Sequence, residues 1–250
     1  MSIADPIRTL YHRAVPKSRR HAIYRALHPE EFRALRSAVN PSPKGTFSLR
    51  RCDELRAIFV HTPKAAGTSI ALSIFGELPY HYTASDYIAI FGRQTFREYF
   101  KFTFVRNPWD RVFSAYTYLK RGGWDENDAA WARKNLGHFE TFTEFVEYGL
   151  RSRQVMEFMH FIPQRDFICD WRGRLLVDYL GYFETIASDF KAICTRIGCE
   201  SSLHHTNRST EADYRAAYTA TSRQIVGDIY ARDIALLGYD FEGIRTRRWL

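Results

Sequence analysis

The chain has 250 residues, 45% of them hydrophobic, and a formal net charge of +8 at pH 7. This length and hydrophobic content suffice for one substantial core, and no run of about 18 apolar residues is present that would span a membrane. Arginine supplies most of the positive charge, which favours anionic partners such as nucleotides, sulfated sugars or nucleic acid, although composition alone is better explained by an ordinary solvated surface.

The N-terminal residues 1–50 are basic and are expected to form an arm packed on the domain that follows. Two helical pieces are predicted in this arm, at residues 7–14 and 19–39, and the Pro- and Gly-containing stretch 40–45 then breaks the chain. The first 20 residues lack the apolar core of a secretory signal, so we expect a cytoplasmic protein. The four cysteines show no metal-binding spacing and are expected to be reduced.

Residues 51–250 are predicted to form a single domain in which strands alternate with helices. Short apolar runs rich in β-branched and aromatic residues predict strands at residues 57–61, 100–105 and 175–179. Helices are predicted between and after them, the last at about residues 221–237. Such alternation indicates a mainly parallel sheet flanked by helices. The predicted fold class is therefore α/β, with the three layers of a P-loop-like fold.

The first predicted strand leads through small residues into a helix, an order that creates a phosphate cradle. The N–H groups of the first helical turn point outward there, and the helix dipole adds partial positive charge. Lys64 supplies a cation. The residues that follow it are small or carry a hydroxyl: Ala65, Ala66, Gly67, Thr68 and Ser69. They leave room for a phosphate at the backbone, but the lysine spacing does not match the ATP- and GTP-binding pattern GxxxxGK[ST].

A second anion-binding residue is predicted at the end of the strand at residues 100–105. Arg106 directly follows this strand, Asn107 is placed to cap the next helix, and Ser114 lies two turns into it. Because ligands of open α/β sheets bind at the carboxyl ends of the strands, we expect Arg106 near the first loop. Taken alone, Arg106 is better explained as an ion-pair partner of Asp110.

Together, HTPKAAGTS (residues 61–69) and FVRNPWDRVFSAY (residues 104–116) resemble the two donor-binding segments of carbohydrate-type sulfotransferases. This group includes heparan 2-O- and chondroitin 4-O-sulfotransferases and soluble bacterial relatives. The resemblance implies that the donor is PAPS (3′-phosphoadenosine 5′-phosphosulfate) and that PAP is the product. No metal is expected, because the cysteines and histidines lack metal-binding spacing. It further implies that residues 64–69 hold the 5′-phosphosulfate, while Arg106 and Ser114 hold the 3′-phosphate.

The implied reaction is an in-line displacement, catalysed by positioning and charge stabilisation, with Lys64 at the leaving group. The acceptor needs a base, and several members of the group place a catalytic histidine where His81 lies; packing on neighbouring tyrosines explains His81 equally well. His160 is a second candidate, for orienting the acceptor or as the base, although a structural histidine is more ordinary there. Weaker similarity implies that Arg208 and Ser209 contact the 3′-phosphate, with helix capping as the alternative.

The acceptor implied by the resemblance is a carbohydrate hydroxyl, in a glycan or glycolipid, and no nucleic acid is expected as a partner. Several aromatic residues offer a platform for a sugar, although core packing explains them better: Trp124, Trp131, Phe139, Phe142 and Phe145. Two other functions fit parts of the sequence. One is a P-loop nucleotide-dependent phosphotransferase, a kinase; the other is a non-catalytic protein that binds anionic ligands through its charge.

Overall fold

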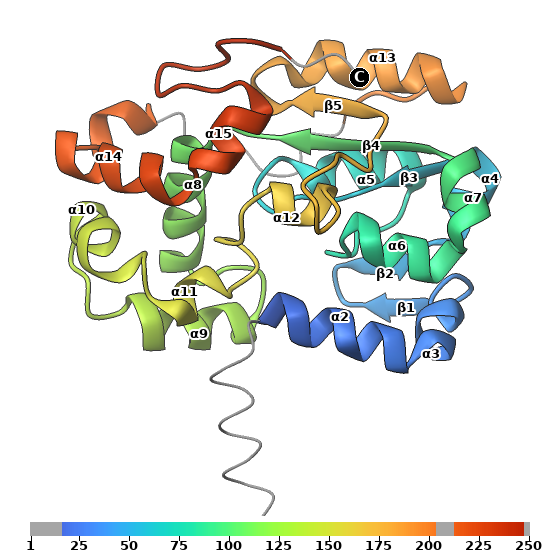
Figure 1. Cartoon of the computed structure of the whole chain (residues 1–250), viewed down its shortest axis with the longest axis horizontal. Helices are drawn as coiled ribbons and strands as arrows, with labels where there is room; N and C mark the ends of the chain where they lie inside the picture. The colour runs from blue at the N-terminus through green and yellow to red at the C-terminus, as the bar shows by residue number, and fades with distance from the viewer. Residues whose placement is uncertain (1–16, 204–212, 248–250) are drawn as a thin grey trace, which may run out of the picture.

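A three-stranded parallel sheet of order β3-β4-β5 lies at the centre of the computed structural model, which describes residues 17–203 and 213–247 (Figure 1). Strand β3 (Ala57–Phe59) pairs with β4 (Phe100–Val105), which pairs on its other side with β5 (Tyr179–Tyr182). All but one residue of the middle strand β4 are buried, as expected for a parallel strand covered on both faces. This arrangement confirms the α/β fold class.

The third strand differs from its predicted position, residues 175–179. The pairing with β4 aligns Phe102 with Tyr179 and Val105 with Tyr182, so the ladder begins later in the chain. Leu175 instead forms an isolated antiparallel bridge with Cys169. Of the strand predicted at residues 175–179, only Tyr179 lies in β5, so this predicted position is wrong.

Helices surround the sheet and form a second layer of packing beside it (Figure 1). Those next to the sheet are α4 (Arg50–Leu55), α5 (Gly67–Phe75), α6 (Ala84–Phe91), α7 (Arg93–Glu98), α8 (Pro108–Lys120), α12 (Arg165–Ile168) and α13 (Ile186–Ile197). The others are α9 (Glu126–Leu136), α10 (Phe142–Glu144), α11 (Arg153–Met156), α14 (Ala220–Ile229) and α15 (Ala231–Leu237). Two buried apolar clusters result, one around the sheet and one between α8, α9 and α14.

The last predicted helix, residues 221–237, is two helices. Tyr230 separates them because its backbone leaves the helical region (φ −103°, ψ 20°). Its side chain is buried, and its hydroxyl donates a hydrogen bond to the carbonyl oxygen of Phe161 at 2.6 Å. Tertiary packing of one tyrosine therefore overrides a helical pattern that is continuous in the sequence.

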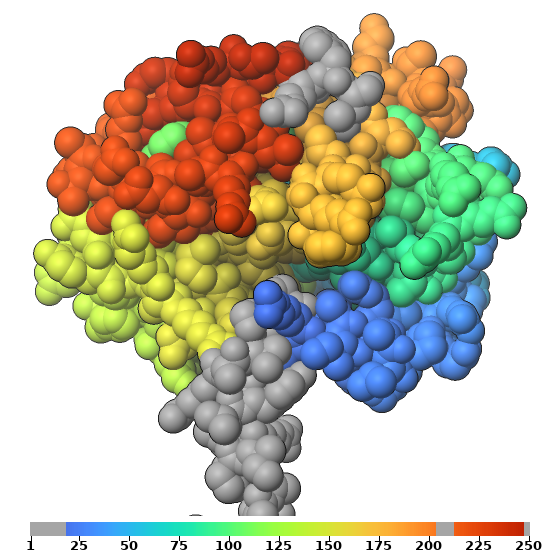
Figure 2. Space-filling model, in the orientation of Figure 1, coloured from blue at the N-terminus to red at the C-terminus, as the bar shows by residue number. Residues whose placement is uncertain are grey.

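The N-terminal arm contains α2 (Lys17–Leu27), α3 (Pro29–Ala34) and an antiparallel hairpin of β1 (Val39–Ser42) and β2 (Gly45–Ser48). The single helix predicted at residues 19–39 is wrong, because Pro29 keeps His28 out of the helical region and starts a new helix. Arg25 of α2 contacts Asp86 of α6 at 2.5 Å. In Figure 2 this arm, in blue, and the C-terminal helices, in red, share one face of the molecule with the middle of the chain between them.

The helix predicted at residues 7–14 lies outside the described residues. The start of the domain at residue 51 stays a prediction. Across the ranges that the structure describes, no helix combines the length and apolar character needed to cross a bilayer.

Candidate functional site

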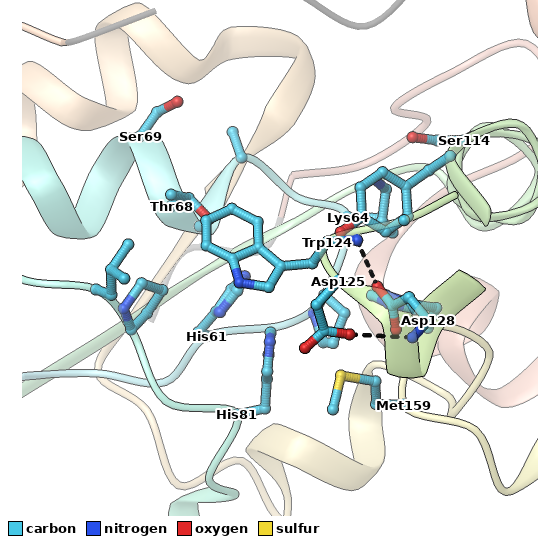
Figure 3. A pocket seen from close by; sticks show the side chains of 18 of the residues that line it. His61, Lys64, Thr68, Ser69, His81, Ser114, Trp124, Asp125, Asp128 and Met159 are labelled. Atoms are coloured by element: carbon cyan, nitrogen blue, oxygen red, sulfur yellow. Dashed lines mark hydrogen bonds and ion pairs between the residues drawn. The ribbon is translucent and has the colours of Figure 1, made fainter. Parts of the chain in front are cut away.

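A cleft of about 710 Å³ opens where β3 and β4 end (Figure 3). The loop after β3 contributes Lys64, and the residue that follows β4 is Arg106; both line the cleft. Further walls come from the N-terminal hairpin and from the segment between α8 and α9. The structure therefore brings the two sequence motifs together at the carboxyl edge of the sheet, where open α/β sheets bind their ligands.

The loop between β3 and α5 has an unusual backbone. Lys64 (φ +71°) and Ala66 (φ +60°) both occupy the left-handed region, which side chains rarely adopt. Left-handed residues two positions apart are typical of a concave anion-binding nest, in which successive N–H groups turn toward one point. Helix α5 then begins at Gly67 without a side-chain cap, so its first turn faces the nest with its helix-dipole charge.

Gly67 is required by its neighbour His61. A Cβ atom at Gly67 would lie 1.8 Å from Cδ2 of His61, far inside contact distance. The glycine therefore lets the imidazole lie directly beneath the loop. His61 was not singled out from the sequence, although it stands just before the phosphate loop.

The side chain of Lys64 is half-buried against helix α8, with Nζ 3.4 Å from the centre of the Tyr118 ring. Burial lowers the pKa of Lys64 to about 7, the positive charge of Arg106 acts in the same direction, and Asp128 opposes them. Near neutral pH the amine is thus poised between its charged and neutral forms. An anion placed in the nest would favour the charged form.

Arg106 makes both of the contacts that the sequence suggested as alternatives. Its Nε and Nη2 atoms donate to the carboxylate of Asp110 at 2.6 and 2.8 Å. Its Nη1 atom donates to Oγ of Ser114 at 3.0 Å and to the backbone carbonyl of Lys64 at 3.2 Å. The guanidinium also lies 4.1 Å from the centre of the Phe183 ring. Arg106 therefore links the end of β4, helix α8 and the phosphate loop.

A buried network fixes the backbone of Arg106. The side-chain amide of Gln164 accepts a hydrogen bond from the backbone N–H of Arg106 at 2.9 Å and donates one to the backbone carbonyl oxygen of Arg106 at 2.8 Å. Asp233 of α15 accepts in turn from the backbone N–H of Gln164 at 2.6 Å. Burial raises the pKa of Asp233 to about 6, against the opposing effect of Arg111. No local sequence pattern identified Asp233, because it lies almost 70 residues from its partner.

Glu184 accepts hydrogen bonds from the backbone N–H of Asn107 at 2.9 Å and from the hydroxyl of Tyr239 at 2.8 Å. The first of these bonds ties the residue after Arg106 to the end of β5. Glu184 therefore connects the ends of β4 and β5.

Three imidazoles line the cleft: His61, His81 and His160. The rings of His61 and His81 pack together with centroids 4.4 Å apart, whereas Tyr80 and Tyr82 stack on each other. Burial lowers the pKa of His81 to about 4, helped by His160 and opposed by Asp128. The structural alternative for His81, packing on its tyrosine neighbours, is replaced by packing on another histidine.

The aromatic residues named as a possible sugar platform divide into two groups. Phe142 and Phe145 are buried in the helical core, and Trp131 stacks on Phe158 at 3.8 Å, as core packing predicted. Trp124 instead lines the cleft (Figure 3). Lys44 of the hairpin lies with Nζ 4.2 Å from its ring and donates a hydrogen bond to its backbone carbonyl.

Two predictions concern residues or ions beyond these contacts. Arg208 and Ser209 lie outside the described residues, so their predicted contact with the 3′-phosphate stays a prediction. Within residues 17–203 and 213–247, no three His, Cys, Asp or Glu side chains are grouped to hold a metal ion. The four cysteines are free thiols.

Comparison with known proteins gives the family. The sequence model of the Sulfotransferase family matches residues 78–240, which include Arg106 and Ser114; the phosphate loop precedes the matched range. An uncharacterized protein of Archaeoglobus fulgidus is 30% identical over 125 residues, which are 50% of this chain and 89% of that protein. Carbohydrate sulfotransferase 14 of Danio rerio is 29% identical over 131 residues.

That second match covers 47% of this chain but only 35% of the zebrafish protein. No solved structure gives a significant match. The family match alone extends over well over half of the residues. The chain therefore belongs to the sulfotransferase family.

Proposed function

We propose that this chain transfers a sulfuryl group from PAPS to a hydroxyl group of a carbohydrate. The observation that supports this most strongly is the contact of Arg106 Nη1 with the carbonyl oxygen of Lys64 at 3.2 Å. It joins two cationic sites in one cleft. A nucleotide with a phosphate at the 3′ position and a phosphosulfate at the 5′ position requires two such sites, whereas ATP carries its charge on one side of the ribose.

In this proposal the nest and the first turn of α5 bind the 5′-phosphosulfate. Residues 64–69 offer backbone N–H groups, the Lys64 amine, and the hydroxyls of Thr68 and Ser69. Arg106 and Ser114 bind the 3′-phosphate. The contacts of Arg106 described above use one hydrogen of Nε, one of Nη2 and two of Nη1, which leaves one Nη2 hydrogen for the phosphate.

The transfer proceeds in line. An electron pair of the acceptor oxygen forms the new O–S bond while the bond from sulfur to the bridging phosphate oxygen breaks, and PAP departs. Negative charge grows on that oxygen, where the Lys64 amine and the loop N–H groups stabilise it. The acceptor proton passes to a histidine of the cleft; His81 and His160 are the two that the sequence named.

A carbohydrate acceptor, in a glycan or glycolipid, is supported by the relative whose name is carbohydrate sulfotransferase 14. It is also supported by Trp124, a large flat ring at the wall of the cleft. Aromatic rings of this kind offer extensive apolar contact at low cost in conformational entropy.

The test has two stages. Calorimetry with PAP and with ATP and Mg²⁺ separates the proposed function from a P-loop phosphotransferase; we expect PAP to bind and ATP with Mg²⁺ not to. Labelled PAPS is then incubated with a panel of glycans and glycolipids, and the sulfated product is identified by mass. Absence of PAP binding would overturn the proposal, whereas binding without any sulfated product would favour a non-catalytic nucleotide-binding protein.

A further inference from the structure

Asp128 of helix α9 lines the cleft together with the buried His160. Its Oδ2 atom accepts a hydrogen bond from the backbone N–H of Trp124 at 2.8 Å. The same oxygen lies 3.6 Å from Nε2 of His160. One carboxylate thus contacts both a residue of the cleft wall and an imidazole inside the cleft.

His160 is only 6% exposed, and neither of its ring nitrogens has a hydrogen-bond partner among the described residues. Its ring is held edge-on between Tyr118 and Phe158, with centroids 5.3 Å from each. Leaving a buried polar group without a partner costs about 1–3 kcal/mol, so such a group in a cleft indicates a functional use. The 3.6 Å gap to Asp128 is slightly too long for a hydrogen bond, as is common in enzymes without their substrates.

We infer that Asp128 positions His160 as the base that accepts the proton of the acceptor hydroxyl, an inference that rests on the proposed function. When the gap closes, the Nε2 proton of His160 is donated to Asp128, and Nδ1 is left with its lone pair. The acceptor O–H bond breaks and its proton goes to Nδ1, while the oxygen electron pair forms the bond to sulfur and PAP leaves. The resulting imidazolium is stabilised by the carboxylate.

The charges around His160 favour it over His81 for this role. Facing His160 are Lys64 of the phosphate loop, Arg111 and Tyr118 of α8, Asp128 of α9, and the imidazoles of His61 and His81. Asp128 is the one carboxylate in this set. Asp128 also raises the pKa of His81, but His81 packs on the ring of His61 and forms no ion pair with a carboxylate in the part of the chain that the structure describes.

Opposing influences act on the pKa of His160. Burial lowers it, Lys64 and Arg111 act in the same direction, and Asp128 raises it. Removing the carboxylate therefore lowers the pKa of His160 further. If kcat requires neutral His160, the fall of kcat at acid pH then begins at a lower pH. The plateau of kcat above that pH also falls, because His160 is a weaker and less well oriented base.

The experiment measures kcat against pH for Asp128→Asn and His160→Gln, with PAP affinity measured in parallel. Asp128→Asn keeps an oxygen that accepts from Trp124, yet removes the charge. We expect its plateau to fall at least about tenfold and its acid limb to move down by about one pH unit or more. We expect His160→Gln to lose about 10²–10⁴ in kcat. His160→Gln should leave PAP affinity within about twofold, because His160 lies outside the proposed donor sites. Asp128 raises the pKa of Lys64, so Asp128→Asn should weaken PAP binding above neutral pH and leave it nearly unchanged at acid pH, where Lys64 is charged.

Asp125→Asn is the matched control. Asp125 caps α9 through hydrogen bonds from the backbone N–H groups of Asn127 and Asp128, and asparagine caps helices equally well. Its pH profile should therefore match that of the unaltered protein.

The inference is overturned if Asp128→Asn leaves the acid limb in place, or if His81→Gln abolishes that limb while His160→Gln does not. Failure of the proposed function looks different, because the unaltered protein would then bind no PAP at all.

Discussion

The two ends of the cleft, which we propose bind the donor and the acceptor, are built in different ways. At the donor end, Lys64 and Arg106 directly follow neighbouring strands, and Arg106 alone makes four short contacts. At the acceptor end, Lys44, Trp124 and His160 come from a hairpin, an interhelical segment and a loop, and few hydrogen bonds connect them. The geometry of parallel strands fixes the first end, whereas packing between distant segments creates the second. Changes at the donor end should therefore act on PAP binding and on the leaving group, and those at the acceptor end on acceptor binding and on the removal of its proton.

The largest effect is expected from Lys64→Ala. Loss of the cation at the leaving group should lower kcat by about 10²–10³, as for other preorganised oxyanion donors. Lys64→Arg is the control for charge without the same geometry, and should recover part of the rate. Single-turnover assays with labelled PAPS measure the step. A Lys64→Ala enzyme with unchanged kcat would remove Lys64 from the chemistry.

Arg106→Lys should weaken PAP binding by about 10- to 100-fold, because charge-assisted hydrogen bonds contribute about 1.5–3 kcal/mol each. Affinity for adenosine 5′-phosphate, which lacks the 3′-phosphate, should hardly change. Calorimetry with both nucleotides gives the comparison. Equal loss for both would show that Arg106 acts by supporting the loop through Lys64 and not by binding the 3′-phosphate.

PAP binding should depend on pH through Lys64. Its pKa of about 7 in the free protein rises when the anion binds, so binding above pH 7 takes up a proton. Affinity should then fall by up to about tenfold per pH unit above pH 7, until the pKa of the complex is reached. Calorimetry at pH 8 in buffers of different ionisation enthalpy measures the proton uptake. Lys64→Ala should abolish it, and uptake that persists in this variant would assign the proton to another group.

The smallest effect is expected from Lys44→Ala. An exposed cation–π contact contributes about 0.5–1 kcal/mol, so loss of the contact with Trp124 should raise the acceptor KM about two- to fivefold. PAP affinity and kcat should stay unchanged, which a steady-state assay with varied acceptor measures. Lys134→Ala is the control, because it removes a charge of the same sign from a residue that does not line the cleft. A change in PAP affinity would show that the two ends are not independent.

The sequence predicted the donor end better than the acceptor end. Strand β4 and the start of α8 were predicted because an apolar run, Asn107 and Pro108 are local signals, and Asn107 does accept a hydrogen bond from the N–H of Trp109 at 3.0 Å. The adjacency of Lys64 and Arg106 follows from the rule that parallel strands end at one edge. Their chemical roles stay predictions until PAP binding is measured.

The acceptor end gave no comparable signal. In the sequence, Asp128 has the pattern of an exposed acidic residue in a helix. Its approach to His160 depends on how α9 packs against a loop more than 30 residues away. Lys44 lies in a stretch predicted only as a break, because a hairpin contact with Trp124 has no local pattern. Tyr230 shows the same limit in the fold, since burial of one side chain divided a predicted helix. Local patterns specify elements, but contacts between non-neighbouring elements need the packed structure.

The left-handed residues Lys64 and Ala66 lower the free energy of unfolding of the domain. Each left-handed non-glycine residue costs on the order of 1–3 kcal/mol, a cost that the folded domain carries at all times. Glycine would relieve it but would let the loop sample many shapes. In the proposed function, a loop that already has its bound shape loses little conformational entropy when the nucleotide binds, and it would accept the next donor without rearranging.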